Sequence, residues 1–135
     1  MAIKMSETVR NSRLDAVEIA IGATAVLKIR TGLPPTNIAD VDSGTVLAVL
    51  TLPSDWMNPA SIGSKIKSGV WQDVSADAGG IAGHFRLYAS NGITQHMQGT
   101  ITATSGGGDM ELDNVNIAVG QTVSITTFTL TDGNG

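Results

Sequence analysis

Cysteine is absent from this chain of 135 residues, and so is any long apolar run. Without cysteine, the protein has no disulfide bonds, no thiolate metal ligands and no cysteine nucleophile. No uninterrupted apolar stretch approaches the roughly twenty residues that a membrane-spanning helix needs. Lys4, Arg10 and Arg13 precede an apolar patch, but Asp15 and Glu18 interrupt it. A secretory leader needs an unbroken apolar segment, so we expect none here.

Charge is also scarce. Charged residues make up 15% of the sequence, whereas they are about a quarter of an average soluble domain. Eight Lys and Arg against twelve Asp and Glu give a net charge of −4. Binding of nucleic acid requires cations that neutralise phosphates, so we expect no nucleic-acid partner. Interface cores are depleted in charge, and a surface this poor in charge is consistent with contact between subunits.

One helix is expected, at the N-terminus. Ser6 can cap it, and Glu7 suits the positive end of the helix dipole. Leu14, Val17 and Ile21 then repeat at helical spacing, and Gly22 follows as a residue that tolerates left-handed geometry. The sequence predicts a single short amphipathic helix over residues 6–21.

Beyond this helix the apolar period changes from 3.6 to 2. Leu27 and Ile29 alternate with Lys28 and Arg30, which is typical of a half-buried strand. Residues 45–52 ("TVLAVLTL") are apolar on both faces and predict a central strand that is covered from both sides.

Short segments of strand character recur between Gly and Asn clusters, about eight in all. Aromatic residues are only 4% of the chain, so the expected core is aliphatic. We therefore expect a mainly β fold, an antiparallel β-sandwich of jelly-roll or immunoglobulin-like topology, over residues 23–135. An N-terminal arm and the short helix, residues 1–22, would precede it.

Residues 81–101 ("IAGHFRLYASNGITQHMQGTI") predict a hairpin. A three-residue loop, 90–92, with Gly92 in the left-handed conformation, sets Phe85 opposite Met97 and so matches apolar with apolar. This register turns the alternate side chains toward solvent, namely His84, Arg86, Tyr88 and His96.

The last strand pattern changes phase. Val123 and Ile125 share one face, whereas Phe128 and Leu130 follow the opposite alternation. A β-bulge near Thr126 and Thr127 would return all four side chains to the core.

No catalytic, cofactor-binding or metal site is expected. His84 and His96 are the only histidines, and they alternate outward as isolated polar groups. Asp109, Glu111 and Asp113 alternate along one strand without the ligand spacing of a calcium loop. Residues 105–109 ("SGGGD") lead into a strand and not into a helix N-terminus, so they predict a hairpin connection and not a phosphate-binding loop. We expect no enzyme, no cofactor and no small-molecule substrate.

Large apolar residues outside the strand pattern are the candidate partner contacts. Trp56 and Met57 lie in a long polar loop, where they either cover the core as a lid or anchor a partner. Trp71 is out of phase with its apolar neighbours, and the arm "MAIKM" has no assigned core position. The candidates are Met1, Ile3, Met5, Trp56, Met57 and Trp71.

Five segments in this order and spacing resemble a family of small structural proteins from the virions of tailed bacteriophages, including capsid cement or decoration proteins. They are "LKIRTGLPP" (27–35), "SGTVLAVLTLP" (43–53), "ADAGGIAGHFRLY" (76–88), "MELDNVNIAVGQTV" (110–123) and "ITTFTLTDGN" (125–134). The resemblance implies a non-catalytic protein that is made in the host cytoplasm and stabilises the capsid surface. Its expected partners are the major capsid protein and copies of itself, with no nucleic acid and no membrane.

Two alternatives remain. A tail, baseplate or fibre module that binds a host glycan would present aromatic side chains over a shallow groove, and Trp56, Trp71 and Tyr88 could supply them. A calcium-dependent or hydrolytic enzyme would need the acidic strand residues to converge with His84 or His96, which their alternation opposes.

Overall fold

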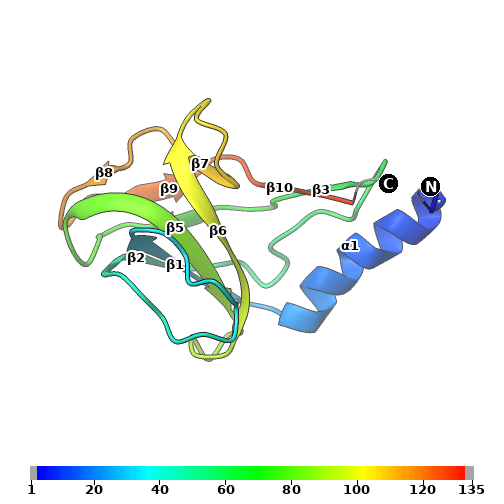
Figure 1. The fold of residues 1–135 in the computed structure, drawn as a ribbon, viewed down its shortest axis with the longest axis horizontal. Helices are drawn as coiled ribbons and strands as arrows, with labels where there is room; N and C mark the ends of the chain where they lie inside the picture. The colour runs from blue at the N-terminus through cyan, green and yellow to red at the C-terminus, as the bar shows by residue number, and fades with distance from the viewer. Residues whose placement is uncertain (1–2, 133–135) are drawn as a thin grey trace.

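The computed structural model describes residues 3–132 as a mainly β protein with one N-terminal helix (Figure 1). In chain order the elements are α1 (Glu7–Ile21), β1 (Val26–Thr31), β2 (Val46–Thr51), β3 (Ser64–Ile66), β4 (Trp71–Asp73), β5 (Gly80–Tyr88), β6 (Gln95–Ala103), β7 (Met110–Leu112), β8 (Asn116–Ile117), β9 (Val123–Ile125) and β10 (Thr129–Thr131).

The largest sheet runs in the order β2-β1-β5-β6-β7, with β8 paired to β5, and it curls into a half-barrel around the core (Figure 1). Its pairs are antiparallel except for β6 with β7, which are parallel. Two small antiparallel sheets, β10-β3 and β4-β9, complete the described structure. The expectation of a mainly β chain with one helix is confirmed. The finer expectation of an antiparallel sandwich is not, because one curled mixed sheet encloses most of the core.

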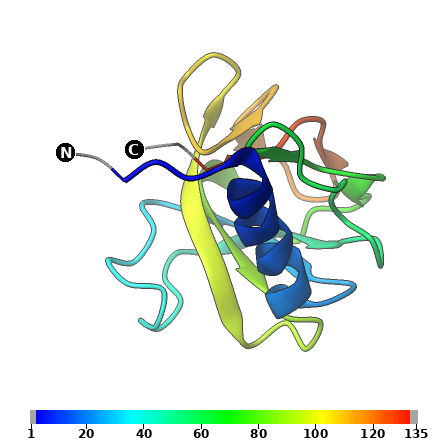
Figure 2. The same cartoon turned by 90° about the vertical axis from the view of Figure 1, so that its right-hand side faces the viewer.

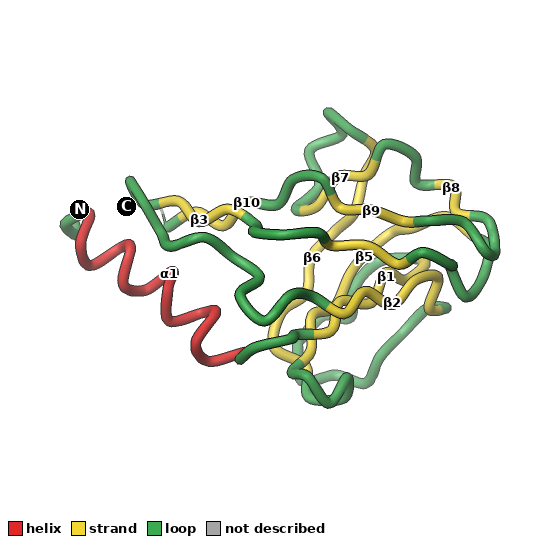
Figure 3. Tube along the Cα trace, turned by 180° about the vertical axis from the view of Figure 1, so that it is seen from behind, coloured by secondary structure: helices red, strands yellow, loops and turns green. Residues whose placement is uncertain are grey.

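The helix begins and ends where the sequence predicts. The Ser6 hydroxyl accepts the backbone N–H of Val9 at 3.3 Å, which caps the N-terminus. Gly22 ends the helix with φ of +93°, a conformation that favours glycine. The helix lies across one end of the half-barrel (Figure 2), and β3 and β10 extend from the main body toward its N-terminal half (Figure 3).

The predicted hairpin is present, with Gly92 in the left-handed conformation at φ of +68°. Its register differs from the expected one by two residues, so that Leu87 lies opposite Met97 and Phe85 lies opposite Gly99. A β-bulge between Leu87 and Tyr88 and a loop one residue longer than expected account for this shift. A shift of two keeps the same side chains on the core face, because strand faces alternate with period 2.

The opposite face of the hairpin corrects a prediction. His84, Arg86 and Tyr88 are fully buried and do not face solvent. The segment of residues 32–44, between β1 and β2, folds over this face of the sheet, and its backbone accepts hydrogen bonds from Arg86. Both faces of β5 are therefore covered. His96, on β6, is exposed as expected.

Strand β2 is covered on both faces, as its apolar pattern predicts, because Leu47, Ala48 and Leu50 are fully buried. It nevertheless lies at the edge of the main sheet. Asp73 accepts the backbone N–H of Val49 at 2.9 Å, and Leu47 accepts the N–H of Asp77 at 2.8 Å. The segment of residues 73–78 thus covers an edge that would otherwise be open.

The predicted bulge near Thr126 and Thr127 is a complete break between two strands. β9 pairs with β4, whereas β10 pairs with β3. The interruption has the expected effect, because Phe128 is buried and Leu130 packs against the core. A change of pairing partner, and not an extra residue in one ladder, changes the phase.

The glycine-rich segment of residues 105–109 does not connect a hairpin. It lies between the parallel strands β6 and β7, and the N–H of Gly108 donates to the Thr102 hydroxyl at 2.9 Å. The chain returns past Thr100 and Thr102 before it enters β7 in the same direction as β6.

Candidate interaction surfaces

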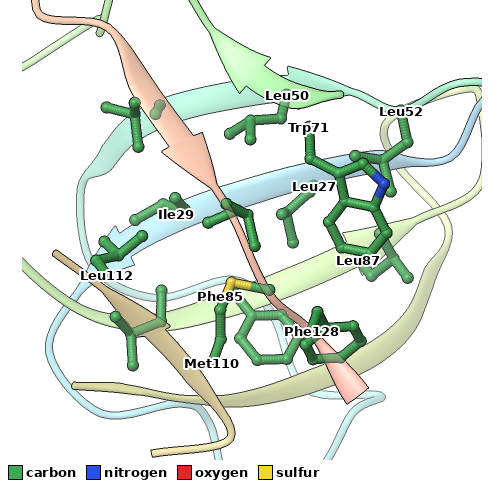
Figure 4. Packing of buried hydrophobic residues seen from close by; sticks show 14 of the residues in the cluster. Leu27, Ile29, Leu50, Leu52, Trp71, Phe85, Leu87, Met110, Leu112 and Phe128 are labelled. Atoms are coloured by element: carbon green, nitrogen blue, oxygen red, sulfur yellow. The ribbon is translucent and has the colours of Figure 1, made fainter. Parts of the chain in front are cut away.

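Three of the predicted partner contacts lie in the core. Trp56, Met57 and Trp71 are at most 1% exposed. Trp56 and Trp71 pack with ring centroids 6.0 Å apart. Phe128 and Phe85 continue this aromatic row from Trp71, as Figure 4 shows. The Trp56 Nε1–H donates to the Gly22 carbonyl at 2.9 Å and ties the loop to the end of α1. Trp56 and Met57 therefore cover the core and do not anchor a partner, and Trp71 is part of the same core.

The arm residues are placed differently. The Ile3 side chain is 76% exposed and that of Met5 is 36% exposed. An N–H of the Arg13 guanidinium contacts the Met5 sulfur at 3.1 Å, next to the start of α1. Met1 lies outside the described residues. Partner contact through the arm stays a prediction.

A row of acceptors on α1 docks the helix onto the segment that precedes β3. Glu7, Asn11, Asp15 and Glu18 are spaced by four, four and three residues, so they share one face of the helix. Each accepts one backbone N–H from residues 57–63, at 2.9–3.2 Å; the donors are Ile62 to Glu7, Gly63 to Asn11, Ala60 to Asp15 and Met57 to Glu18. This acceptor row holds a segment that has little regular pairing of its own.

Lys65, on β3, reinforces this contact. Its side chain is 2% exposed and its ammonium lies 2.8 Å from Asp15 and 3.1 Å from Glu18. Burial alone would lower the pKa of Lys65, but hydrogen bonds to the two carboxylates and their negative charges outweigh it and raise the pKa. The hydrogen bond from Lys65 is also the largest influence that lowers the pKa of Asp15.

The turn between Ser61 and Ser64, next to the acceptor row of α1, carries an exposed and strained isoleucine. Ser61 and Ser64 exchange backbone hydrogen bonds around Ile62 and Gly63, which have φ of +53° and +67°. Two consecutive positive φ angles define a tight hairpin turn that favours Asn or Gly at its first central position. Ile62 is a β-branched residue in that position, and its side chain is 76% exposed. The conformation of this turn therefore does not favour an isoleucine at this position.

A second polar cluster lies under the segment of residues 32–44. Asp42 accepts from Arg86 and Arg30 at 2.9 Å and from the Tyr88 hydroxyl at 2.8 Å. Desolvation opposes the charge of Asp42, but these hydrogen bonds and the two cations outweigh it and lower the pKa of that carboxyl. For Tyr88, burial is the largest influence and raises the pKa of the phenol.

Arg86 holds this segment through its entire guanidinium. Beyond Asp42, it donates to the Asp40 and Asn37 carbonyls at 2.8 and 3.2 Å and to the Gln98 side chain at 3.0 Å. Gln98 in turn donates to the Pro35 carbonyl. A fully buried cation therefore organises a segment without regular secondary structure.

His84 borders the same cluster. Its Nδ1 lies 2.9 Å from the Gly32 carbonyl, so the ring proton is on Nδ1, because a carbonyl only accepts. The buried Nε2 has no partner among the described residues. Burial, only partly offset by the bond to Gly32, and the charges of Arg30 and Arg86 lower the pKa of His84. Both influences favour the neutral imidazole over the charged form.

A groove of about 310 Å³ opens between β6 and β10. Phe85 and Phe128 form its floor, and their rings meet edge to face with centroids 5.8 Å apart. Its walls are made by short runs of consecutive strand residues, and its full lining is Phe85, Met97, Gln98, Asp109, Phe128, Thr129, Leu130 and Thr131.

Across residues 3–132, no three His, Asp or Glu side chains gather closely enough to hold a metal ion. Asp109 accepts from the backbone and hydroxyl of Thr100, and Glu111 accepts the N–H of Gly107, so these carboxylates order the loop between β6 and β7. No helix in this part of the chain has the length and apolar character to cross a membrane.

Comparison with known proteins adds no relative, because no family model, curated protein or solved structure matches the chain.

Sequence reasoning missed the two polar clusters, although signals for both are present. The acceptors on α1 recur at helical spacing, yet Asp15 and Glu18 served only as interruptions of an apolar patch. Arg30 and Arg86 alternate with apolar residues as on a solvated face, and only the acidic residues of the 32–44 segment hint at a covering partner.

Proposed function

We propose that this protein is a non-catalytic structural component of a phage virion, a cement or decoration protein that stabilises the lattice of the major capsid protein. The resemblance of its strand and turn segments to small virion proteins supports this proposal. The exposed apolar side chains of this chain supply the kind of surface that such a role requires.

The observation that carries the proposal is the exposure of large apolar side chains on a chain with little charge. Within residues 3–132, fourteen Ile, Leu, Val and Met side chains are at least 36% exposed. Single exposed apolar residues are ordinary, but groups of them mark interaction sites. One group surrounds the N-terminal half of α1 and consists of Ile3, Met5, Val9 and Ile62. Another lies in the segment of residues 32–44 and consists of Leu33, Ile38 and Val41.

Ile62 supports the same role. Strained residues persist where function favours them, and the inference runs from the observed strain to a hypothesis of function. An exposed isoleucine in a turn that favours asparagine or glycine is suited to contact with another protein. The group around α1 is therefore our first candidate for the surface that grips the capsid.

The alternative, a tail or fibre module that binds a glycan, requires exposed aromatic side chains, and the three candidates are buried. Trp56, Trp71 and Tyr88 are at most 1% exposed, so they cannot stack against a sugar. The proposal and this alternative also predict different partners, and one experiment separates them.

The test is co-sedimentation of the purified protein with assembled capsids and, separately, with isolated tails of its phage. We expect saturable binding to capsids at a fixed copy number per lattice unit. Ile62→Asp should weaken this binding, whereas Ile93→Asp, at an equally exposed residue of the β5–β6 loop, should not. Binding to tails alone, or to neither particle, would overturn the capsid assignment and direct the search to glycans.

A further inference from the structure

The groove between β6 and β10 is bordered by two strand edges. Consecutive residues Met97 and Gln98 line one side, and consecutive residues 129–131 line the other. Neighbouring residues of a strand point to opposite faces, so a groove that both of them line meets the backbone edge between them. Within residues 3–132, no strand pairs with β10 on this side, and β7 pairs with β6 only at residues 101–103.

Backbone groups on both edges point into the groove. Phe128 and Asp132 bond with the β3 side, through Lys67 N–H to Phe128 O and Asp132 N–H to Gly63 O. Because the groups alternate along an antiparallel strand, those of Thr129 and Thr131 face the other way. On β6, the N–H of Thr100 donates to Asp109, away from β5, so the backbone groups of Gln98 share that outward direction.

The floor of the groove is apolar. Phe85 and Phe128 close it from below, and the partly buried Met97 and Leu130 contribute from its two sides. A strand placed between the two edges would find hydrogen-bond partners on both sides and an apolar surface for every second side chain. These are the features that allow recognition by strand addition.

The N-terminal arm has the matching pattern. In "MAIKM", Met1, Ile3 and Met5 alternate with Ala2 and Lys4, which is the period of a strand with one apolar face. Ile3 is 76% exposed, so this side chain does not occupy the groove of its own chain. Lys4 carries a positive charge, and Asp109 supplies a negative one at the β6 side of the groove.

We propose that the groove between β6 and β10 accepts the N-terminal arm of a second copy of this chain as an added strand. Ile3 packs between the partly buried side chains of Met97 and Leu130, and the arm backbone bonds with Gln98 on one edge and with Thr129 and Thr131 on the other. The arm and the groove belong to the same chain, so each copy offers one of each. Self-association by this route needs no other protein. It takes Ile3 and Met5 from the group around α1 and leaves Val9 and Ile62 for contact with the capsid.

Because the natural chain has no cysteine, engineered thiols give a specific test. One protein carries Ile3→Cys, and a second carries Thr129→Cys or Thr131→Cys. We expect the mixture to form disulfide-linked heterodimers several-fold faster than a mixture of Ile3→Cys with Ile93→Cys, an exposed position on the loop between β5 and β6. Equal rates with groove and control thiols would overturn the proposal. A double variant that carries Ile3→Cys and Thr129→Cys in the same chain gives a second test. A disulfide that forms only within one chain would also overturn the proposal.

A second variant tests the edge without a thiol. Thr129→Pro removes a backbone N–H that faces the groove. This N–H does not donate a hydrogen bond to β3, so the fold should survive the substitution. We expect loss of the associated species in sedimentation velocity, matching that caused by deletion of residues 1–5. Full association of a folded Thr129→Pro protein would overturn strand addition. Both tests use the purified chain alone, so their failure would leave the capsid measurement to be judged by itself.

Discussion

Arg86 on β5 and Asp42 in the segment of residues 32–44 form an ion pair of 2.9 Å across 44 positions of sequence. The Arg86 side chain is 0% exposed and that of Asp42 is 34% exposed, so the anion closes the cluster toward solvent. Arg30 pairs with the second oxygen of the same carboxylate. One acidic residue therefore serves two buried cations.

Asp42→Ala should be strongly destabilising, because it leaves Arg30 and Arg86 without their anion. Loss of one partner of a buried ion pair costs about 3–5 kcal/mol, and the partial exposure of Asp42 points to the lower end. Urea unfolding measures the change. Asp40→Ala is the matched control in the same segment, because its carboxylate accepts the N–H of Asn37 and, within residues 3–132, pairs with neither arginine. Similar losses in the two variants would contradict a special role for Asp42.

His84 should make the protein less stable as the pH falls below about 6.5, the ordinary pKa of histidine. Its pKa is lowered in the folded state, so below that pH the unfolded chain binds a proton that the folded chain does not. The free energy of unfolding then falls by at most about 1.4 kcal/mol per pH unit. Denaturation between pH 5 and 7 measures this slope. His84→Gln should flatten it, and His96→Gln, at the exposed histidine, should not.

Lys65→Met should weaken the docking of α1, because Asp15 and Glu18 lose the cation between them. Asp15 is 41% exposed, so water partly replaces the lysine, and we expect a loss of about 2–4 kcal/mol. Thermal unfolding, with hydrogen exchange of the 57–63 amides, measures both parts of the effect. Lys67→Met is the control, since among the described residues that ammonium contacts the Gly69 carbonyl and the face of Trp71 and forms no ion pair with α1. Unchanged exchange in the Lys65 variant would show that the acceptor row suffices.

Ile62→Asn should stabilise the isolated protein by about 1 kcal/mol, because asparagine tolerates the positive φ of the turn. If Ile62 serves partner contact, the same variant weakens capsid binding while it raises the midpoint of thermal unfolding. These two opposite shifts are the expected signature. A variant that is more stable and binds equally well would remove Ile62 from the interface.

The composition, period and caps of the sequence by themselves determined a mainly β chain with one N-terminal helix. These signals are local: Ser6 and Gly22 bound the helix through contacts within a turn, and alternation shows which side chains share a strand face. They correctly place Phe85, Leu87 and Met97 on the core face, even though the register moved by two residues.

Only the tertiary structure decided which faces meet water and which edges stay open. Alternation cannot distinguish a solvated face from one that a distant segment covers, and for that reason His84, Arg86 and Tyr88 were wrongly placed outside. Nor can it show that β9 and β10 choose different partners, or that β6 and β10 border a common groove. Those outcomes depend on contacts between residues far apart in the chain, where the pairing of Arg86 with Asp42 and of Lys65 with Asp15 and Glu18 selects one arrangement.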